Sequence, residues 1–221
     1  RLAKECLLSD KDVLVEKPLT EKVWQAEELL KLAKQKDRIL QVGHLERFNP
    51  AVKRARQFLK QPLFIECHRL NSFVERCTEV NVVLDLMIHD LDILLNFVPS
   101  RVISIDAVGT PVLSSTIDIA NVRLRFQNGC VANLTASRIS FKPMRKMRIF
   151  QPDMYLSLDF HQSTVDVYRR IVDHASVLPE IKGEQFSAGK QDALAAEVQS
   201  FVTAVRHRTL PVVTAESAFE A

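Results

Sequence analysis

Glycine is scarce in this chain of 221 residues, which contains five glycines between Gly43 and Gly189. No two of them have the spacing of a G-x-G-x-x-G turn, the motif that lets the pyrophosphate of a dinucleotide approach the start of a helix. The sequence given therefore carries no dinucleotide-binding fingerprint.

Other absences narrow the class of protein further. No apolar run approaches the roughly 20 residues needed to cross a bilayer, so we expect no membrane partner. The net charge of +3 is too small to indicate nucleic acid, and the basic residues from 138 to 148 alternate with Met and Ile, which is most simply the pattern of a strand face. The four cysteines form no C-x-x-C pair, which favours reduced thiols in a cytoplasm. We expect Cys67 and Cys130 to pack inside strands.

The N-terminal part has the pattern of a strand, a helix and a second strand. The strand "VLVEK" is followed by "TEKVWQAEELLKLAKQKD", whose apolar residues recur at helical spacing with Thr20 as a candidate N-cap, and then by "RILQVGH". Short links between these segments predict parallel pairing of the two strands. We therefore expect the end of a parallel α/β unit here.

The rest of the chain predicts an α/β (α+β) domain with a large, mainly antiparallel open sheet. Asn49-Pro50 has the pattern of an N-cap and first helical position, "LFIECHRL" is a strand, and 82–98 is an apolar helix that ends before Pro99. Six strands follow between 101 and 169, each expected to alternate apolar and polar residues, with a hairpin turn at Asn128-Gly129. Residues 173–190 are expected to be irregular, and two helices close the sequence.

The helix at 82–98 carries an unusual polar stripe, made of Asp85, His89, Asp92 and Asn96, while Asp90 points elsewhere. Asp, His and Asn are poor helix formers, and neither Asp85 nor His89 has a cation one turn away, so a purely solvated face is the weaker interpretation. An Asp one turn from a His can orient its ring and raise its basicity. A metal site that uses Asp85, His89 and His44 is disfavoured, because no second His or Cys stands at ligand spacing.

Two cations are ambiguous on their own. Lys17 stands where a buried strand ends, which is where open α/β sheets place their chemistry, yet a Lys before a proline is commonly a turn residue. Arg47 lies near a helix start, where arginine is commonly a surface charge.

Five segments, taken in order, resemble the landmarks of the glucose–fructose oxidoreductase/inositol dehydrogenase (Gfo/Idh/MocA) family over nearly the whole chain. They are "VLVEKPLT", "QVGHLERFNPAV", "VVLDLMIHDLDILL", "DIANVRLRFQNGCVANLTASR" and "EVQSFVTAVRHRTLPVVTAESAFEA". The resemblance implies a Rossmann domain, of which residues 1–48 would be a remnant, and a C-terminal domain at 49–221 for substrate binding and oligomerisation. The glycine turn of the family would lie upstream of residue 1.

The resemblance also implies a function and a site. It implies an NAD(P)-dependent oxidoreductase that acts on a sugar hydroxyl, with NAD or NADP as cofactor, and a homodimer or homotetramer formed through the C-terminal sheet. Within the family, two segments are most similar to the branch that oxidises the 3-hydroxyl of a UDP-N-acetylhexosamine. The alternative is a truncated, non-catalytic sugar-binding or oligomerisation module. The implied catalytic residues are Lys17, Asp85 and His89; the cofactor-binding residues are Glu16, Lys17, Pro18 and His44; the substrate-binding residues are Arg47, Asn49, Asp85 and His89. The resemblance further implies that the Lys17–Pro18 bond is cis.

Overall fold

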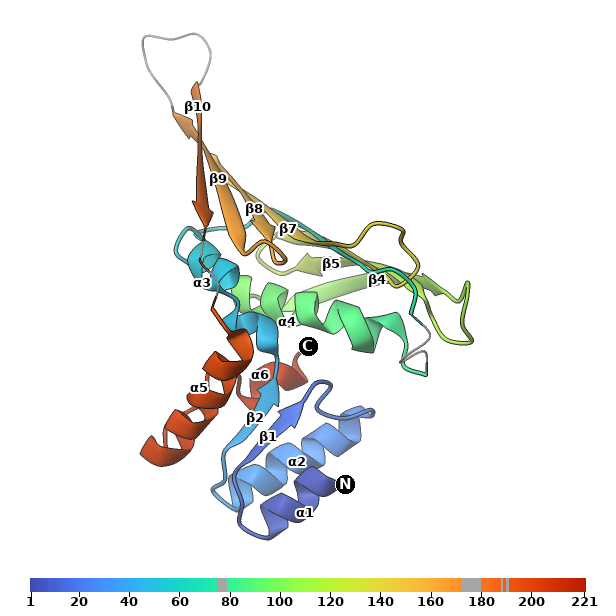
Figure 1. Cartoon of the computed structure of the whole chain (residues 1–221), viewed down its shortest axis with the longest axis vertical. Coiled ribbons are helices and arrows are strands. Elements are labelled where there is room, and N and C mark those ends of the chain that lie inside the picture. Colours follow the sequence, from blue (N-terminus) through green and yellow to red (C-terminus); the bar gives the residue numbers. More distant parts are fainter. Residues whose placement is uncertain (75–78, 172–179, 188, 190) are drawn as a thin grey trace. The chain divides into compact units, whose positions relative to one another are not determined.

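The computed structural model divides into two compact units (Figure 1). It describes residues 1–74, 79–171, 180–187, 189 and 191–221. Unit 1 contains 1–48 together with 191–221, and unit 2 contains 49–190. The sequence analysis placed 191–221 in the second domain. The structure differs because the two last helices pack against elements of the N-terminal part.

Unit 1 is a small α/β layer around two parallel strands. Strand β1 (Val13–Glu16) pairs with strand β2 (Leu40–Gly43), with Val13 opposite Leu40. The helices are α1 (Leu2–Leu8), α2 (Val23–Gln35), the short 3-10 turn η1 (Leu45–Phe48), α5 (Ala193–His207) and α6 (Ala215–Phe219). The parallel pairing confirms the prediction made from the short strand–helix–strand links.

The predicted start of helix α2 is wrong by two residues. The helix begins after Lys22, whose backbone N–H donates to the side chain of Gln25 at 3.1 Å. The hydroxyl of Thr20 donates instead to the carbonyl of Lys22 at 2.9 Å. Thr20 thus shapes the turn before the helix and does not cap it, because the chain bends between the two positions.

Unit 2 is an eight-stranded sheet in the order β10-β9-β8-β7-β3-β6-β5-β4. All neighbours are antiparallel except β3 and β6, so the predicted mainly antiparallel sheet is confirmed. The strands are β3 (Phe64–Leu70), β4 (Val102–Thr110), β5 (Ile119–Phe126), β6 (Val131–Ser137), β7 (Met144–Gln151), β8 (Met154–Asp159), β9 (Thr164–Ile171) and β10 (Glu180–Ser187). Helix α3 (Pro50–Arg56), a π-helical turn η2 (Val83–Met87) and α4 (Ile88–Phe97) complete the unit.

Two predictions for this unit are wrong in part. Residues 180–187 are not irregular: they form β10, which pairs with β9 along its whole length. Strand β4 does not alternate, because it is the end strand and nearly all of it is exposed. The hairpin at Asn128-Gly129 is confirmed, and Gly129 has a φ of 89°, which glycine adopts without strain.

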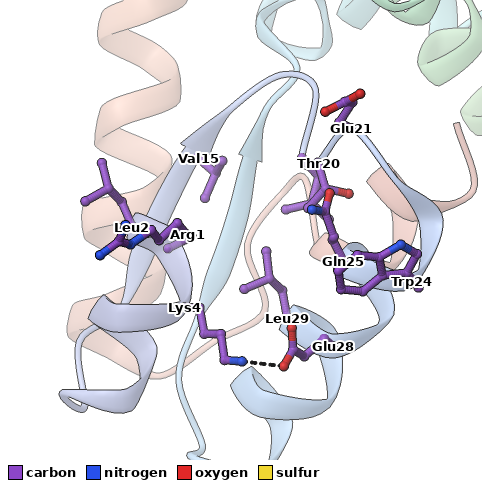
Figure 2. Close-up of a pocket in the computed structure, with 12 residues that line it drawn as sticks. Arg1, Leu2, Lys4, Val15, Thr20, Glu21, Trp24, Gln25, Glu28 and Leu29 are labelled. Carbon is purple, nitrogen blue, oxygen red and sulfur yellow. Dashed lines mark hydrogen bonds and ion pairs between the residues drawn. The ribbon is translucent and has the colours of Figure 1, made fainter.

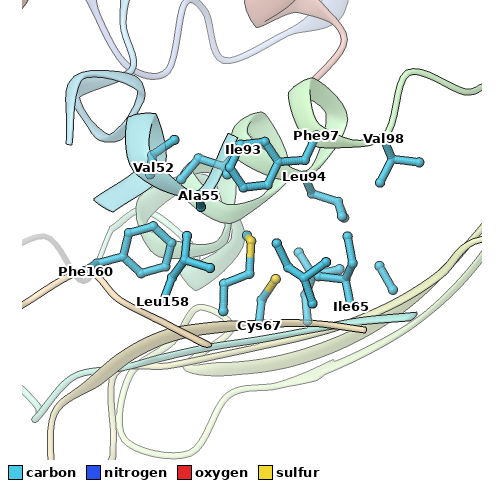
Figure 3. Close-up of a cluster of buried hydrophobic side chains, with 14 of the residues drawn as sticks. Val52, Ala55, Ile65, Cys67, Ile93, Leu94, Phe97, Val98, Leu158 and Phe160 are labelled. Atoms are coloured by element: carbon cyan, nitrogen blue, oxygen red, sulfur yellow. The ribbon is translucent and has the colours of Figure 1, made fainter. Parts of the chain in front are cut away.

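The core of unit 2 lies between the helices and one face of the sheet (Figure 3). Side chains from α3 and α4, such as Ala55 and Leu94, meet Ile65, Cys67 and Leu158 from the strands. Every second residue of β5 to β8 points into this layer, as alternation along a half-buried strand requires. Burial of this face fixes the helix that carries Asp85 and His89 to the sheet.

The opposite face of the sheet carries a ladder of aromatic rings. Phe64, Phe150, Tyr155 and Tyr168 occupy directly opposed positions on four neighbouring strands, with ring centroids 5.9, 4.9 and 5.6 Å apart. Gly183 stands next in the register, and a Cβ there would meet the Tyr168 ring at 2.9 Å. This row is called the aromatic ladder below.

Candidate functional site

The carboxyl ends of β1 and β2 carry the first group of predicted residues. Glu16 is the last residue of β1 and stands opposite Gly43, so Lys17 and His44 follow the ends of two neighbouring parallel strands. A Cβ at Gly43 would lie 2.9 Å from Oε2 and 3.2 Å from Cα of Glu16, so the two strand ends approach closely here. His44 is 1% exposed. The Lys17–Pro18 bond is cis, as the resemblance implies.

This edge has the position where open parallel sheets bind dinucleotides, outside the carboxyl ends of their strands. Glu16, Lys17, Pro18 and His44 fit one end of such a site within unit 1. A turn that could cradle a pyrophosphate is absent from the sequence, as its five scattered glycines show. Glu16, Lys17, Pro18 and His44 therefore fit one part of a dinucleotide site, and their role toward a nicotinamide stays a prediction.

Glu197 is a residue of unit 1 that the sequence analysis missed. Its side chain lies in the middle of α5 and is 1% exposed, and its backbone carbonyl accepts a hydrogen bond from Nε2 of Gln41 at 3.5 Å. Burial, and after it the negative charge of Glu16, raises the pKa of Glu197 to about 7. The sequence pattern could have revealed this buried carboxylate, because Glu197 interrupts the helical spacing of Ala193, Phe201 and Ala204 on one face.

Arg47 and Asn49 lie at the junction of β2 with helix α3, and both are nearly buried, at 9% and 8% exposed. Oδ1 of Asn49 accepts from the backbone N–H of Ala51 at 2.9 Å, which confirms the predicted N-cap of α3. Nδ2 of Asn49 donates to the carbonyl of Phe160 at 3.2 Å. Through these bonds Asn49 caps α3 and joins it to Phe160. A role in substrate binding for Asn49 and for Arg47 stays a prediction.

Asp85 and His89 lie on the helical segment η2–α4 of unit 2, and both are half-buried. Asp85 falls inside the π-helical turn, whereas His89 is the second residue of the regular helix α4. Single π-turns within helices occur frequently at functional sites. Oδ1 of Asn81 caps the segment by accepting from the N–H groups of Val83 and Leu84, both at 3.1 Å.

The other members of the predicted stripe have different surroundings. Asp92 is buried at 1% exposed, while Asn96 is half-buried and its Oδ1 accepts a hydrogen bond of 2.7 Å from Arg56 on α3. Asp90 lies off the stripe, as predicted, and the structure directs it to Arg69 on the sheet. The four residues of the stripe thus differ in their surroundings, and a catalytic role for Asp85 and His89 stays a prediction.

Asp90 forms a buried ion pair with Arg69 that the sequence analysis missed. Nε and Nη2 of Arg69 donate to the two carboxylate oxygens of Asp90, at 2.9 and 2.8 Å, and both side chains are about 3% exposed. The Arg69 guanidinium also lies 5.3 Å from the centroid of the Phe160 ring. The sequence signal for this pair was the position of Arg69, a charged residue at a core-facing position of β3.

A second buried pair joins Arg138 to Asp118 at 3.6 Å. Arg138 donates to the carbonyl of Val80, just before the η2–α4 segment, so the prediction that the whole basic cluster is a strand face is wrong at this residue. Burial opposes ionisation of Asp118, but the Ser114 hydroxyl and the backbone N–H groups of 112–114 donate to it and together hold its pKa well below its ordinary value.

Two of the cysteines are buried in unit 2. Cys67 and Cys130 are buried, as predicted, and burial raises the pKa of both thiols, that of Cys130 to about 11. Cys6 is exposed on α1, and Cys77 lies outside the described residues. Across the described ranges, no three His, Cys, Asp or Glu side chains are arranged to hold a metal ion. None of the helices described there is long and apolar enough to span a membrane.

A pocket of about 600 Å³ lies in unit 1, and none of the predicted site residues is among its lining residues (Figure 2). It is bordered by α1, α2 and the end of β1, with Val15, Leu19 and Leu29 as apolar walls. Lys4 and Glu28 form an ion pair of 2.5 Å beside it. None of the predicted site residues lines this pocket, so it is separate from the candidate site.

The comparisons with known proteins identify the class, because both parts of the chain match models of one oxidoreductase family. Residues 1–44 match the oxidoreductase family with an NAD-binding Rossmann fold, and residues 52–152 match the GFO/IDH/MocA C-terminal domain. The chain belongs to the Gfo/Idh/MocA oxidoreductase family.

Within this family the chain is similar to UDP-N-acetylglucosamine 3-dehydrogenase of Acidithiobacillus ferrooxidans, with 37% identity over 193 residues, 87% of this chain and 62% of that protein. The solved structure of this enzyme superposes with a TM-score of 0.93 and 33% identity, over 99% of this chain and 70% of that one. An oxidoreductase from Agrobacterium radiobacter, solved in complex with NAD+, L-tartaric acid and magnesium, shares the fold with a TM-score of 0.84 and 14% identity. The chain thus spans about three fifths of the curated relative's length.

Proposed function

We propose that the intact protein is a nicotinamide-dependent sugar dehydrogenase that oxidises the 3-hydroxyl of a UDP-N-acetylhexosamine. The observation that carries this proposal is the similarity to UDP-N-acetylglucosamine 3-dehydrogenase over 87% of the chain. The presence of Asp85 and His89 one turn apart on a segment capped by Asn81 supports it from the chemistry of the site.

His89 is the proton acceptor in this proposal. A neutral imidazole can take the proton of a hydroxyl, and a carboxylate one helical turn away holds the ring in the required tautomer and favours its protonated form. Asp85 has that position. Lys17 is the electrostatic partner: an ammonium group near the reacting oxygen stabilises the charge that develops as the proton leaves.

A nicotinamide cofactor, when bound, supplies the hydride acceptor. In this proposal Glu16, Lys17, Pro18 and His44, at the ends of β1 and β2, hold its nicotinamide end, and Arg47 and Asn49 help to bind the substrate. Because the chain spans 62% of its curated relative, we propose that the pyrophosphate is held by residues outside this sequence. The choice between NAD and NADP depends on the same residues.

The open face of the sheet in unit 2 is the proposed site of self-association. Its aromatic ladder is only half-buried, with Tyr168 at 42% exposed. Contiguous apolar surface of this kind usually marks an interaction site. A homodimer or homotetramer formed through this face would cover it.

A substrate screen of the intact protein tests the function. We expect NADH or NADPH absorbance to rise with UDP-N-acetylglucosamine, and free glucose and inositol serve as controls that lack the nucleotide. Turnover of the free sugars without turnover of the UDP-sugar would overturn the substrate assignment. No turnover with any sugar, by a protein shown to bind nicotinamide cofactor, would favour the alternative of a non-catalytic module.

A further inference from the structure

The residue that follows His89 makes the strongest polar contact that the structure describes between helix α4 and the sheet. Consecutive residues of a helix point about 100° apart, so Asp90 is directed to the sheet when His89 is not. Both oxygens of Asp90 accept from Arg69, at 2.9 and 2.8 Å, and Asp90 and Arg69 are each 2% exposed. Any rotation of α4 about its axis would break at least one of these two bonds.

A gain in folding stability does not explain the buried ion pair of Arg69 and Asp90. Burying two charges costs desolvation energy, and replacing a buried ion pair by well-packed apolar residues is often neutral or stabilising. The surroundings are the apolar core, and burial followed by the negative charge of Asp90 raises the pKa of the neighbouring Cys67 thiol. An apolar pair would fill this space, but it would lack the directional fork of a guanidinium on a carboxylate.

The anchor for this fork is firmly held. Arg69 lies on β3, which is paired on one side with β6 and on the other with β7, so the strand has little freedom to shift. The Phe160 ring, 5.3 Å from the guanidinium, supports it further. A planar group fixed in this way defines both the height and the rotation of the helix that it contacts.

The π-turn makes such an anchor necessary at this point of the chain. Asp85 lies within η2 (Val83–Met87), where the helical repeat differs from that of α4, whereas His89 lies just beyond it. The angle between Asp85 and His89 therefore depends on where the regular helix resumes. Asp90, three residues after the end of the π-turn, fixes that point to the sheet.

We propose that Arg69 and Asp90 are positioning residues, whose buried fork fixes the rotation of α4 and thereby the angle at which His89 and Asp85 meet the reacting hydroxyl. The expected effect of these two residues on turnover rests on the proposed function. Their expected effect on the His89 ring does not depend on that function.

The test uses an apolar double variant of the intact protein, Arg69→Met with Asp90→Leu. Removing one partner of a buried pair leaves an unpaired buried charge and is strongly destabilising, whereas removing both avoids that charge. We expect Asp90→Leu alone to lower the melting temperature and the double variant to restore it. The double variant should still lose about 10- to 100-fold in kcat, since small misplacements of reacting groups carry losses of this size, with less than about a threefold change in KM.

Two further variants keep the test decisive. Arg56→Met removes the exposed 2.7 Å hydrogen bond to Asn96, another contact of α4, and should leave kcat unchanged. Arg69→Lys keeps a positive charge but replaces the fork by a point charge, so it should fold and lose kcat even if the double variant does not fold. Wild-type kcat in Arg69→Lys, or in a double variant of restored stability, would overturn the proposal.

A nuclear magnetic resonance titration of His89 separates this proposal from the proposed function. The ring signal is assigned by its loss in His89→Gln, and its midpoint is compared between wild type and the two Arg69 variants. We expect the midpoint to move by about half a pH unit or more, because the partnership with Asp85 changes. A shifted midpoint in a protein that turns over no sugar would leave the positioning role intact and remove the function; an unchanged midpoint would overturn the positioning role.

Discussion

Asp118 accepts four hydrogen bonds from the single segment 112–114, of which the shortest is the 2.6 Å bond from the Ser114 hydroxyl. The same carboxylate faces Arg138, which donates to the carbonyls of Val80 and Ile117. The N–H of Val82 donates to Ile117 as well, at 2.9 Å. One buried carboxylate thus organises the loop and the chain that leads into the helix of Asp85 and His89.

The first prediction concerns Asp118→Asn. An amide keeps the shape but can no longer accept all four bonds or balance Arg138, so we expect the melting temperature to fall by about 5 °C or more. The pKa of Asp118 is lowered by folding, so its stabilising effect is present above the ordinary carboxyl pKa and is lost as the pH falls through the lower folded value. The difference between wild type and variant should therefore shrink in acid. Thermal unfolding between pH 7 and pH 2 measures it, and equal melting temperatures at pH 7 would contradict it.

The second prediction concerns Glu197→Gln. Burial and Glu16 raise the pKa of Glu197 to about 7, so ionisation increasingly opposes folding as the pH rises from the unfolded value of 4.5 to about 7. Glutamine does not ionise. Above pH 7 the variant should be more stable by on the order of 1–3 kcal/mol, and the difference should shrink towards pH 4.5. Urea unfolding at pH 5 and pH 8 measures it, and the exposed Glu21→Gln is the control. A variant no more stable than wild type at pH 8 would show that Glu197 is not held against ionisation.

The third prediction concerns the proposed catalytic groups. Lys17→Ala and His89→Ala in the intact enzyme should each reduce kcat by about 10²- to 10⁴-fold, the usual contribution of a general acid or base. Both side chains are only partly buried, so the melting temperature should change little. Steady-state kinetics with the UDP-sugar measures the effect. Near-normal turnover in both variants, with folding intact, would be incompatible with the mechanism.

Periodicity was enough to predict the elements that carry the proposed site, but not the contacts that hold them. Alternation and helical spacing located β1, β2 and the segment of Asp85 and His89. The π-turn was missed because a change from i→i+4 to i→i+5 bonding leaves no signature in side-chain type. The pair of Arg69 and Asp90 was missed because each pattern shows only which face a residue occupies and not its partner on another element.

Strand β10 and the division of the chain into two units could not be predicted from the sequence, for related reasons. "EIKGEQFS" is too polar to indicate a strand, and its pairing with β9 is supplied by the neighbouring strand. The last two helices are amphipathic, which predicts that they pack but not against which unit. Both outcomes depend on tertiary contacts between segments distant in the sequence.

The fourth prediction concerns cofactor binding by the 221-residue chain. In the proposed site Lys17 and His44, at the ends of β1 and β2, hold only the nicotinamide end, while pyrophosphate binding needs backbone N–H groups at a glycine-rich turn. We expect this chain to bind NAD far more weakly than the intact protein, by about 100-fold or more, since such a loss corresponds to roughly 3 kcal/mol of phosphate contacts. Calorimetry on both proteins compares them. Equal affinity would refute the proposed division of the site.

The last prediction concerns self-association through the aromatic ladder. The ladder runs across β3, β7, β8 and β9, and its rings lie on the face of the sheet away from the core cluster. Because these rings lie outside the core cluster of unit 2, we expect charges there to weaken association with little effect on folding. We expect the chain to form a dimer or tetramer at micromolar concentration, and Phe150→Lys with Tyr155→Lys to raise the dissociation constant at least about tenfold, as burying two unpaired charges would require. Phe141→Lys is the matched control, because Phe141 is fully exposed outside the strands and its substitution should not change the assembly. Light scattering and sedimentation measure all three proteins. A monomeric wild type, or equal loss of assembly in the control, would refute the assignment of the interface to this face.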